Sequence, residues 1–245
     1  MKFDKIVGIG CSFTEGGGLN NIKYYNYLNN LENLSQSQET LNTFMYENNY
    51  IAKLSKLMDI PYENLSESQS SNELIFKKLY NRFVNNTDNI LLVLQTTFFG
   101  RKHIWNSNTN KYYKMSGSNL HGKVENESIV PSNDINQFYE NYLGYFYNEL
   151  DDEKDVFNMA DVYNSFLKEK NVTMVLLPLF KIKHKNFTKN TLLFDNLDLQ
   201  SFAEVNKLRI SDLNININDF HLSDEGNELI ARKIYNFIEY KYART

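Results

Sequence analysis

The chain has 245 residues, which is enough for one large α/β domain or two small ones. Hydrophobic residues make up 42% of it and charged residues 23%, a composition that is typical of a folded protein rather than a disordered one. A formal charge of −4, from 26 basic and 30 acidic side chains, offers no broad basic surface to a nucleic acid. The longest apolar runs, near residues 91–94 and 174–180, are far shorter than the roughly 20 residues of a membrane-spanning helix. No nucleic-acid or membrane partner is expected.

Cysteine content and the first residues predict the cellular setting. Cys11 is the only cysteine, which excludes an internal disulfide and a multi-cysteine zinc site and is typical of a reducing compartment. The opening segment places Asp4 and Lys5 before a short apolar run, unlike a signal peptide. We therefore expect a cytoplasmic protein, or a virion-associated one if a bacteriophage encodes it.

The first part of the chain alternates predicted strands and helices. Residues 6–9 are a short apolar run followed by a glycine-rich loop, which indicates a strand and then a turn. Residues 19–38 show no clear period and are predicted to form a surface insertion. Apolar residues recur at helical spacing over 39–58, which predicts one helix, and residues 61–65 are a second short strand.

The alternation continues toward the middle of the chain. Ser70 to Glu73 carry capping residues before apolar positions at helical spacing, which predicts an amphipathic helix. Residues 89–96 contain a nearly continuous apolar run, the kind that is covered on both faces in a parallel sheet, so a central strand is expected. Aromatic and β-forming residues over 101–114 predict a hairpin that projects from the carboxyl end of this strand.

Two further helices are predicted before the fourth strand. They cover about 133–150 and 155–170, and the acidic run 151–155 between them is interpreted as a solvated turn. Residues 172–179 are predicted to be another buried strand.

The last part of the chain is predicted to end in a helix. Residues 181–217 show no regular pattern and are expected to be irregular. The final helix is predicted over about 224–240, where apolar residues share one face, and Ser223 is its expected N-cap.

This order of elements predicts the fold class and the position of a ligand site. Strands that alternate with helices imply a doubly wound, three-layer α/β sheet. Because there is no internal repeat or linker, we expect a single domain over 1–245 with insertions at about 19–38 and 98–132. Ligands of such folds bind outside the carboxyl ends of the strands, so the loops there are expected to carry the function.

Three residues near the two ends of the chain suggest nucleophilic chemistry. Ser12 follows the first predicted strand directly, whereas Asp219 and His221 lie in the loop before the last helix. A serine nucleophile needs a base, and the base needs a group that orients it. These two loops could supply all three parts at one edge of the sheet.

Three sequence blocks resemble those of the SGNH (GDSL-type) hydrolases. They are residues 10–16 (GCSFTEG), 64–72 (NLSESQSSN) and 219–231 (DFHLSDEGNELIA), and they occur in the order and spacing of that superfamily. The resemblance implies a flavodoxin-like α/β/α domain that hydrolyses esters, often acetyl esters on sugars. It assigns Ser12 as the nucleophile and His221 as the base.

The same resemblance implies an acidic residue that orients the base. Members of the superfamily place it two or three residues before the histidine, which here gives Asp219 or Asn218. An Asn can hold the imidazole by a hydrogen bond but does not stabilise its charged form as a carboxylate does. Asp219 is therefore the predicted acid.

The resemblance also implies an oxyanion hole, and here the sequence departs from the family pattern. The glycine of the second block, whose N–H group would serve as a donor, is replaced by Gln69, with Ser68 and Ser70 as alternatives. A backbone N–H survives such a replacement if the backbone dihedral angles permit.

The third family block, Gly-x-Asn, is missing after the third strand. The strand ends instead in LQTTFFGR, so Thr96 or Thr97 would have to donate through a hydroxyl, or Asn72 from the neighbouring helix start. A Thr-rich strand end followed by Arg101 resembles a variant branch of these proteins found in bacteriophage and bacterial genomes. Arg101 is accordingly a candidate for contact with the substrate or oxyanion, with a surface role at a strand end as the alternative.

Other chemistries are less well supported. Cys11 is predicted to lie in the core and not to act as the nucleophile, because it points to the opposite side of the chain from Ser12. His103, His121 and His184 show no metal-ligand spacing. The glycine pattern of the first loop lacks the third glycine of a dinucleotide site, so no cofactor is expected.

The leading hypothesis is a serine esterase that removes a small acyl group, in the first instance acetyl, from a carbohydrate. Aromatic loops at 24–27 and 98–113 are candidates for sugar stacking. One alternative is a weak or inactive binding or assembly module, associated with a virion or a glycan, that keeps the fold without a working oxyanion hole. Another is an O-acyltransferase that uses the same residues. The oligomeric state is not predicted.

Overall fold

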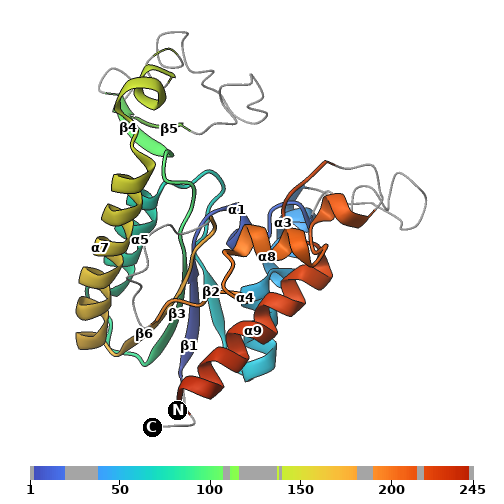
Figure 1. Ribbon diagram of the computed structural model, residues 1–245. Helices are drawn as coiled ribbons and strands as arrows, with labels where there is room; N and C mark the ends of the chain where they lie inside the picture. Colours follow the sequence, from blue (N-terminus) through green and yellow to red (C-terminus); the bar gives the residue numbers. More distant parts are fainter. Residues whose placement is uncertain are drawn as a thin grey trace.

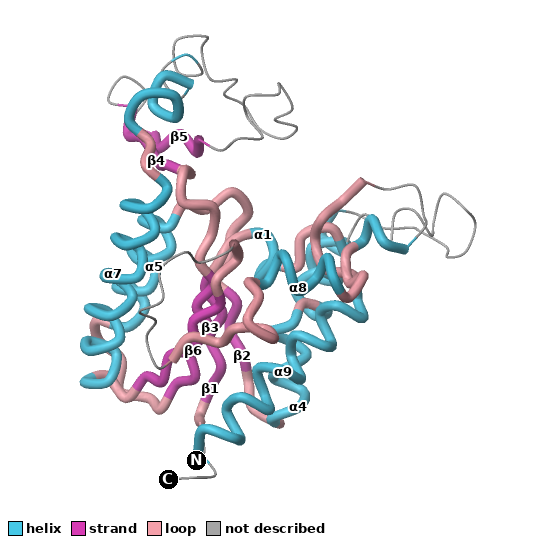
Figure 2. Tube along the Cα trace, in the orientation of Figure 1, coloured by secondary structure: helices cyan, strands magenta, loops and turns pink. Residues whose placement is uncertain are grey.

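A computed structural model of the chain contains a parallel β-sheet covered by helices on both faces (Figures 1 and 2). The structure describes residues 3–19, 38–106, 111–115, 137, 140–180, 190–213 and 218–242. The sheet strands, in spatial order, are β2 (Tyr62–Asn64), β1 (Lys5–Ile9), β3 (Ile90–Gln95) and β6 (Val172–Leu177). All three pairings are parallel. This order is that of flavodoxin-like sheets, so the predicted fold class is confirmed.

Alternating side chains of the strands build two separate hydrophobic cores. Leu91 and Val93 of β3 pack toward α4 (Tyr50–Met58), α8 (Leu199–Val205) and α9 (Asp224–Tyr242). Their neighbours Leu92 and Leu94 pack toward α5 (Asn72–Phe83) and α7 (Glu149–Glu169). Successive side chains of a strand point to opposite faces, so a strand apolar at every position requires helices on both sides. The three layers follow from this pattern.

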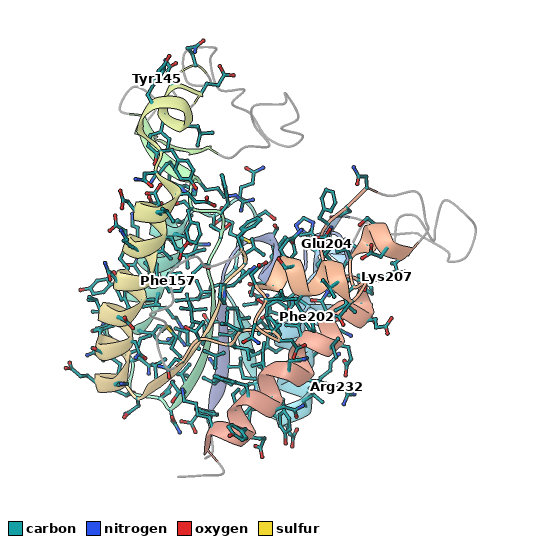
Figure 3. All side chains as sticks on the ribbon, in the orientation of Figure 1. Tyr145, Phe157, Phe202, Glu204, Lys207 and Arg232 are labelled. Atoms are coloured by element: carbon teal, nitrogen blue, oxygen red, sulfur yellow. The ribbon has the colours of Figure 1, made fainter. Side chains whose placement is uncertain are left out.

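Labelled side chains in Figure 3 show which positions are buried between the layers and which are exposed. Phe157 of α7 and Phe202 of α8 are buried against opposite faces of the sheet, whereas Tyr145 is 81% exposed. Tyr145 belongs to η2 (Tyr142–Phe146), a π-helical turn that precedes α7. Among the described helices, none has the length and apolarity needed to cross a bilayer.

The helix predicted over 39–58 is wrong in one respect, because the chain forms two helices there. α3 (Gln38–Asn48) ends just before Asn49, which caps the start of α4 at Tyr50. The Asn49 side-chain oxygen accepts hydrogen bonds from the N–H groups of Ile51 and Ala52, each at 3.0 Å. A capping asparagine satisfies the open N–H groups of a new helix, so it marks a helix start inside a continuous apolar pattern.

The predicted caps and the predicted hairpin are confirmed. The Ser71 hydroxyl accepts from Leu74 N–H at 3.3 Å at the start of α5, and the Ser223 hydroxyl accepts from Gly226 N–H at 3.1 Å at the start of α9. β4 (Lys102–Asn106) and β5 (Lys111–Met115) pair antiparallel. Figure 1 shows this hairpin at the same end of the sheet as α1 (Ser12–Glu15).

Two predictions for the second half of the chain are wrong. The acidic run 151–155 is not a turn between helices but part of the first turns of α7, which begins at Glu149. Acidic side chains are favourable there because they interact with the positive end of the helix dipole. The helix predicted over 133–150 is observed from residue 140 and ends in η2 at Phe146.

The segment 181–217 is not irregular throughout. It contains α8 and the short 3-10 helix η3 (Ile210–Leu213). Both precede the loop that carries Asp219 and His221 and leads into α9. The insertion predicted at 19–38 lies outside the described residues except for its first and last positions. The insertion predicted at 98–132 is described only over 98–106 and 111–115.

Candidate active site

Ser12, His221 and Asp219 form a hydrogen-bonded chain at the carboxyl end of β1. Ser12 is the first residue of α1, and the other two lie in the loop before α9. His221 Nε2 lies 2.7 Å from Ser12 Oγ, and His221 Nδ1 lies 2.6 Å from Asp219 Oδ1. The structure thus brings Ser12 together with a histidine that lies 209 positions further along the chain. Their order is that of nucleophile, base and orienting acid.

The acid of this chain is Asp219 and not Asn218. Asp219 Oδ1 accepts from the backbone N–H of His221 at 2.9 Å as well as from its ring. Its side chain is 12% exposed, whereas Asn218 points to solvent. With Nδ1 donating to the carboxylate, Nε2 is the nitrogen that can take the proton of Ser12.

The loop that carries the base is fixed by backbone pairing with η3. Ile210 N–H donates to His221 O, and Ser211 N–H donates to Asp219 O, each at 2.9 Å. The Phe13 ring lies against the imidazole with a centroid distance of 4.7 Å. The position of the base therefore depends on a segment that the sequence pattern did not reveal.

Two glycines that follow α1 make room for the triad, and sequence reasoning missed this role. A methyl group on Gly17 would lie 3.0 Å from Ser12 Cβ and 3.1 Å from His221 Cδ2. On Gly18, which has φ +86°, it would lie 2.6 Å from Asp219 Oδ2. These distances are below ordinary van der Waals contact, so any side chain at either position would displace the triad. The available signal was the run of three glycines immediately after the nucleophile loop.

A buried polar network connects α1 to α4 and β3. The Thr14 hydroxyl hydrogen-bonds to the Tyr50 hydroxyl at 2.6 Å and to Gln95 Oε1. Because an amide oxygen only accepts, Thr14 donates to Gln95 and Tyr50 donates to Thr14. Burial raises the pKa of Tyr50 well above its usual range, which keeps the phenol protonated as this donor. Cys11 is fully buried beside the same amide, as predicted for a core residue.

Gln69, the predicted backbone donor, lies in the loop after β2. Gln69 has φ +62°, a left-handed conformation that favours glycine, which is the residue the family pattern places here. Glu67 N–H donates to Gly10 O at 3.2 Å and so ties the loop to the residues before the nucleophile. The Ser70 N–H is bonded to Glu67 O, so Gln69 is favoured over Ser70.

Asn72 holds the backbone of Thr97 rather than facing the nucleophile with a free amide. Its side-chain oxygen accepts from Thr97 N–H at 2.9 Å, and its amide nitrogen donates to Thr97 O at 3.3 Å. Both polar atoms of the Asn72 side chain are thus bonded to one residue. Asn72 acts on the site through Thr97.

Thr97, one of the residues predicted to replace the missing Asn, lies just beyond the carboxyl end of β3, the strand that pairs with β1. β1 and β3 are in register, with Ile9 opposite Leu94, so Ser12 and Thr97 each lie three residues beyond a paired position. Arg101 Nη1 donates to Thr97 Oγ1 at 2.7 Å, which leaves the hydroxyl hydrogen to point elsewhere. Thr96 is also buried, and its hydroxyl has no hydrogen-bond partner among the described residues.

Metal ligands are not gathered at the site. The described residues contain no cluster of three His, Cys, Asp or Glu side chains that could hold a metal ion. His103 Nδ1 is bonded to the Ser71 hydroxyl at 2.7 Å. His121 and His184 lie outside the described residues.

Similar solved structures include esterases and lipolytic proteins of the GDSL type, the superfamily that the three sequence blocks resemble. A psychrotrophic esterase from a Pseudoalteromonas species is 11% identical over 99% of this chain and 100% of its own, with a TM-score of 0.47. A lipolytic protein of the G-D-S-L family from Veillonella parvula is 11% identical over 95% and 96%, with a TM-score of 0.39.

An acetylxylan esterase from Geobacillus stearothermophilus, solved as a catalytic mutant, is 13% identical over 95% of this chain and 93% of its own, with a TM-score of 0.45. No family model matches the chain, and no curated protein does. At these identities and TM-scores, the activity has to be argued from the geometry of the site.

Proposed function

We propose that the protein is a serine ester hydrolase that works through Ser12, His221 and Asp219. The single observation that carries this proposal is the hydrogen-bonded chain that joins the three side chains at 2.7 and 2.6 Å. A serine hydroxyl is a weak nucleophile by itself, and a base within hydrogen-bond distance activates it. The proposal is also supported by the position of Ser12 at the carboxyl end of a strand of the parallel sheet, where such folds bind ligands.

The reaction follows from this geometry in two halves. Ser12 Oγ attacks the ester carbonyl while its proton passes to His221 Nε2, and the carbonyl oxygen becomes an oxyanion. The oxyanion collapses, the bond to the alcohol breaks, and the alcohol leaves with the proton from Nε2. Water then loses a proton to the same nitrogen and attacks the acyl group on Ser12. The acid is released and the serine regains its proton.

Three donors are proposed for the oxyanion. They are the N–H groups of Ser12 and Gln69 and the hydroxyl of Thr97. The guanidinium of Arg101 increases the positive potential at that hydroxyl, because it donates to the Thr97 oxygen at 2.7 Å. Asn72 fixes the Thr97 backbone and is a positioning residue. Preorganised donors of this kind are usually the largest single contribution to catalysis of acyl transfer.

The proposed substrate is an ester of a small acyl group, in the first instance acetyl, on a carbohydrate hydroxyl. The Phe13 ring against His221 and the glycines against Ser12 leave the nucleophile in close surroundings, which favours a short acyl chain. We expect the purified protein to hydrolyse p-nitrophenyl acetate. Ser12→Ala should lower kcat by about 10⁴-fold or more, because the nucleophile is lost.

The control for this experiment is Ser165→Ala, which removes a serine from the exposed side of α7. It should leave kcat unchanged. If Ser12→Ala retains the activity of the native protein, the nucleophile assignment is wrong. If acetyl groups appear on an added sugar rather than in water as acetate, the protein is an acyltransferase that uses the same residues.

A further inference from the structure

A polar pocket lies directly beside the nucleophile helix. It has a volume of about 440 Å³, within the range of about 300–1,000 Å³ that is usual for small-molecule sites. Its polar and aromatic lining residues are Glu15, Asn42, Thr43, Tyr46, Asn64 and Ser66. The mechanism proposed above uses none of these side chains.

Residues of α1 and residues bonded to α1 border the pocket. Glu15, which lines it, is three residues after Ser12, and residues at that spacing on a helix have Cβ atoms about 5–6 Å apart. The Asn64 amide donates to Thr14 O at 2.8 Å, so the end of β2 is tied to the same helix. A molecule in this pocket would therefore contact the helix that begins at Ser12.

The lining offers hydrogen-bonding groups of the kind that carbohydrate hydroxyls need. It combines two amides, three hydroxyls and one carboxylate, which together donate and accept. Asn42 and Thr43 are exposed residues of α3, so their side chains are accessible to a ligand in the pocket.

A fixed aromatic ring forms one wall of the pocket. Tyr46 is 43% exposed, and its ring stacks on that of Tyr62 with centroids 5.0 Å apart. Burial raises the pKa of Tyr62 to about 12, so its hydroxyl stays protonated and donates to Tyr46 O at 3.0 Å. A ring held in this way presents a rigid apolar surface, and the C–H face of a pyranose is its natural complement.

The charge of the pocket narrows the class of ligand. Among the described residues that line it, Glu15 is the one charged side chain, and none is a lysine or an arginine. A phosphate or carboxylate on the ligand would therefore be repelled, whereas a neutral sugar would not. A second cavity, of about 460 Å³, lies between α5 and α7 and has a cation, Lys102, among its lining residues. Lys102 is already paired with Glu73 at 3.0 Å and with Asp152 at 3.6 Å.

From these observations we infer that the pocket between α1, α3 and the end of β2 is a subsite for a neutral sugar ring that carries the ester. Tyr46 would stack on the ring, and Asn42, Thr43 and Glu15 would bind its hydroxyls. The inference rests on the proposed hydrolase function and specifies its substrate class. The acyl group would lie at Ser12, and the sugar would leave toward this pocket.

The test compares two esters of the same acid in purified full-length protein. Kinetics are measured for p-nitrophenyl acetate and for a panel of singly acetylated glucose, xylose and xylobiose. Tyr46→Ala should lower the kcat/KM for the best acetylated sugar about tenfold relative to that for p-nitrophenyl acetate, a loss in line with one aromatic stacking contact. Tyr46→Phe keeps the ring and should restore the ratio.

Tyr80→Ala is the matched control, because Tyr80 is 47% exposed on α5 and does not line the pocket. It should leave the ratio unchanged. Binding without turnover is followed by saturation-transfer NMR of xylobiose and glucose with Ser12→Ala, and the signal should weaken when Tyr46→Ala is added. An unchanged ratio in Tyr46→Ala, or no saccharide signal, would overturn the subsite.

Failure of the subsite and failure of the hydrolase proposal give different results. If p-nitrophenyl acetate is hydrolysed through Ser12 but Tyr46→Ala changes both esters equally, the subsite is wrong and the hydrolase stands. If saccharides bind through Tyr46 but no ester is hydrolysed, the subsite stands and the protein is a glycan-binding module.

Discussion

The two sides of the candidate site are built in opposite ways. Around β1, space for the triad comes from missing side chains, because Gly17 and Gly18 allow Ser12, His221 and Asp219 to approach closely. At the end of β3, polar side chains fix the local structure instead, because Asn72 and Arg101 both hydrogen-bond to Thr97. The nucleophile side depends on backbone shape, whereas the oxyanion side depends on replaceable hydrogen bonds. This difference implies that side chains at the end of β3 can be replaced while the triad keeps its geometry.

The largest effect in this comparison is expected at the end of β3. Thr97→Val removes the proposed donor hydroxyl with little change in volume and should lower kcat by about 10²–10³-fold, the usual cost of one oxyanion donor. Thr97→Ser keeps the hydroxyl and should retain most of the activity. Steady-state kinetics with p-nitrophenyl acetate provide the measurement. Full activity in Thr97→Val would remove the side-chain donor from this account.

A smaller effect is expected on the nucleophile side. Gly17→Ala places a methyl group 2.9 Å from Ser12 O and about 3 Å from His221, so the hydrogen bond between serine and histidine must lengthen. A displacement of about 1 Å in an active site can cost about 10²-fold in rate. Gly144→Ala is the control, because a methyl group there meets nothing within 4 Å. Equal kcat in both variants, with unchanged Tm, would show that the glycines do not shape the site.

The smallest effect is predicted for the backbone donor and concerns stability. Gln69 adopts φ +62°, so Gln69→Gly should change the free energy of unfolding by less than about 0.5 kcal/mol, because relief of strain offsets the added chain entropy. Gln69→Val should lower it by about 1–2 kcal/mol, because a β-branched residue is disfavoured in the left-handed region. Urea unfolding measures both. A large loss in Gln69→Gly would mean that the glutamine side chain itself is needed.

Much of the fold could be predicted from the sequence because its signals are local. The apolar run of β3 and the serine caps of α5 and α9 each act within a few residues, and all three were found. The break at Asn49 was missed because apolar periodicity continues across it. The acidic run of α7 was misread because charge alone does not distinguish a solvated turn from a helix N-terminus.

The residues of the candidate site likewise fall into two groups, those that a local sequence signal reveals and those that it does not. Ser12, Asp219 and His221 could be selected because each lies next to a recognisable strand or helix. The network of Thr14, Tyr50 and Gln95 could not, because it depends on the register between β1 and β3 and on the packing of α4. Its members look like ordinary core residues in the sequence. Long-range contacts of this kind have no local pattern.

The most direct test of the central claim is covalent labelling with a fluorophosphonate, which reacts only with an activated serine. The account predicts a single adduct, located on Ser12 by mass spectrometry, and no adduct in Ser12→Ala. His221→Ala should slow the labelling strongly while leaving the fold intact. Absence of labelling in the native protein, or an adduct on another residue, would contradict the assignment of Ser12 as an activated nucleophile.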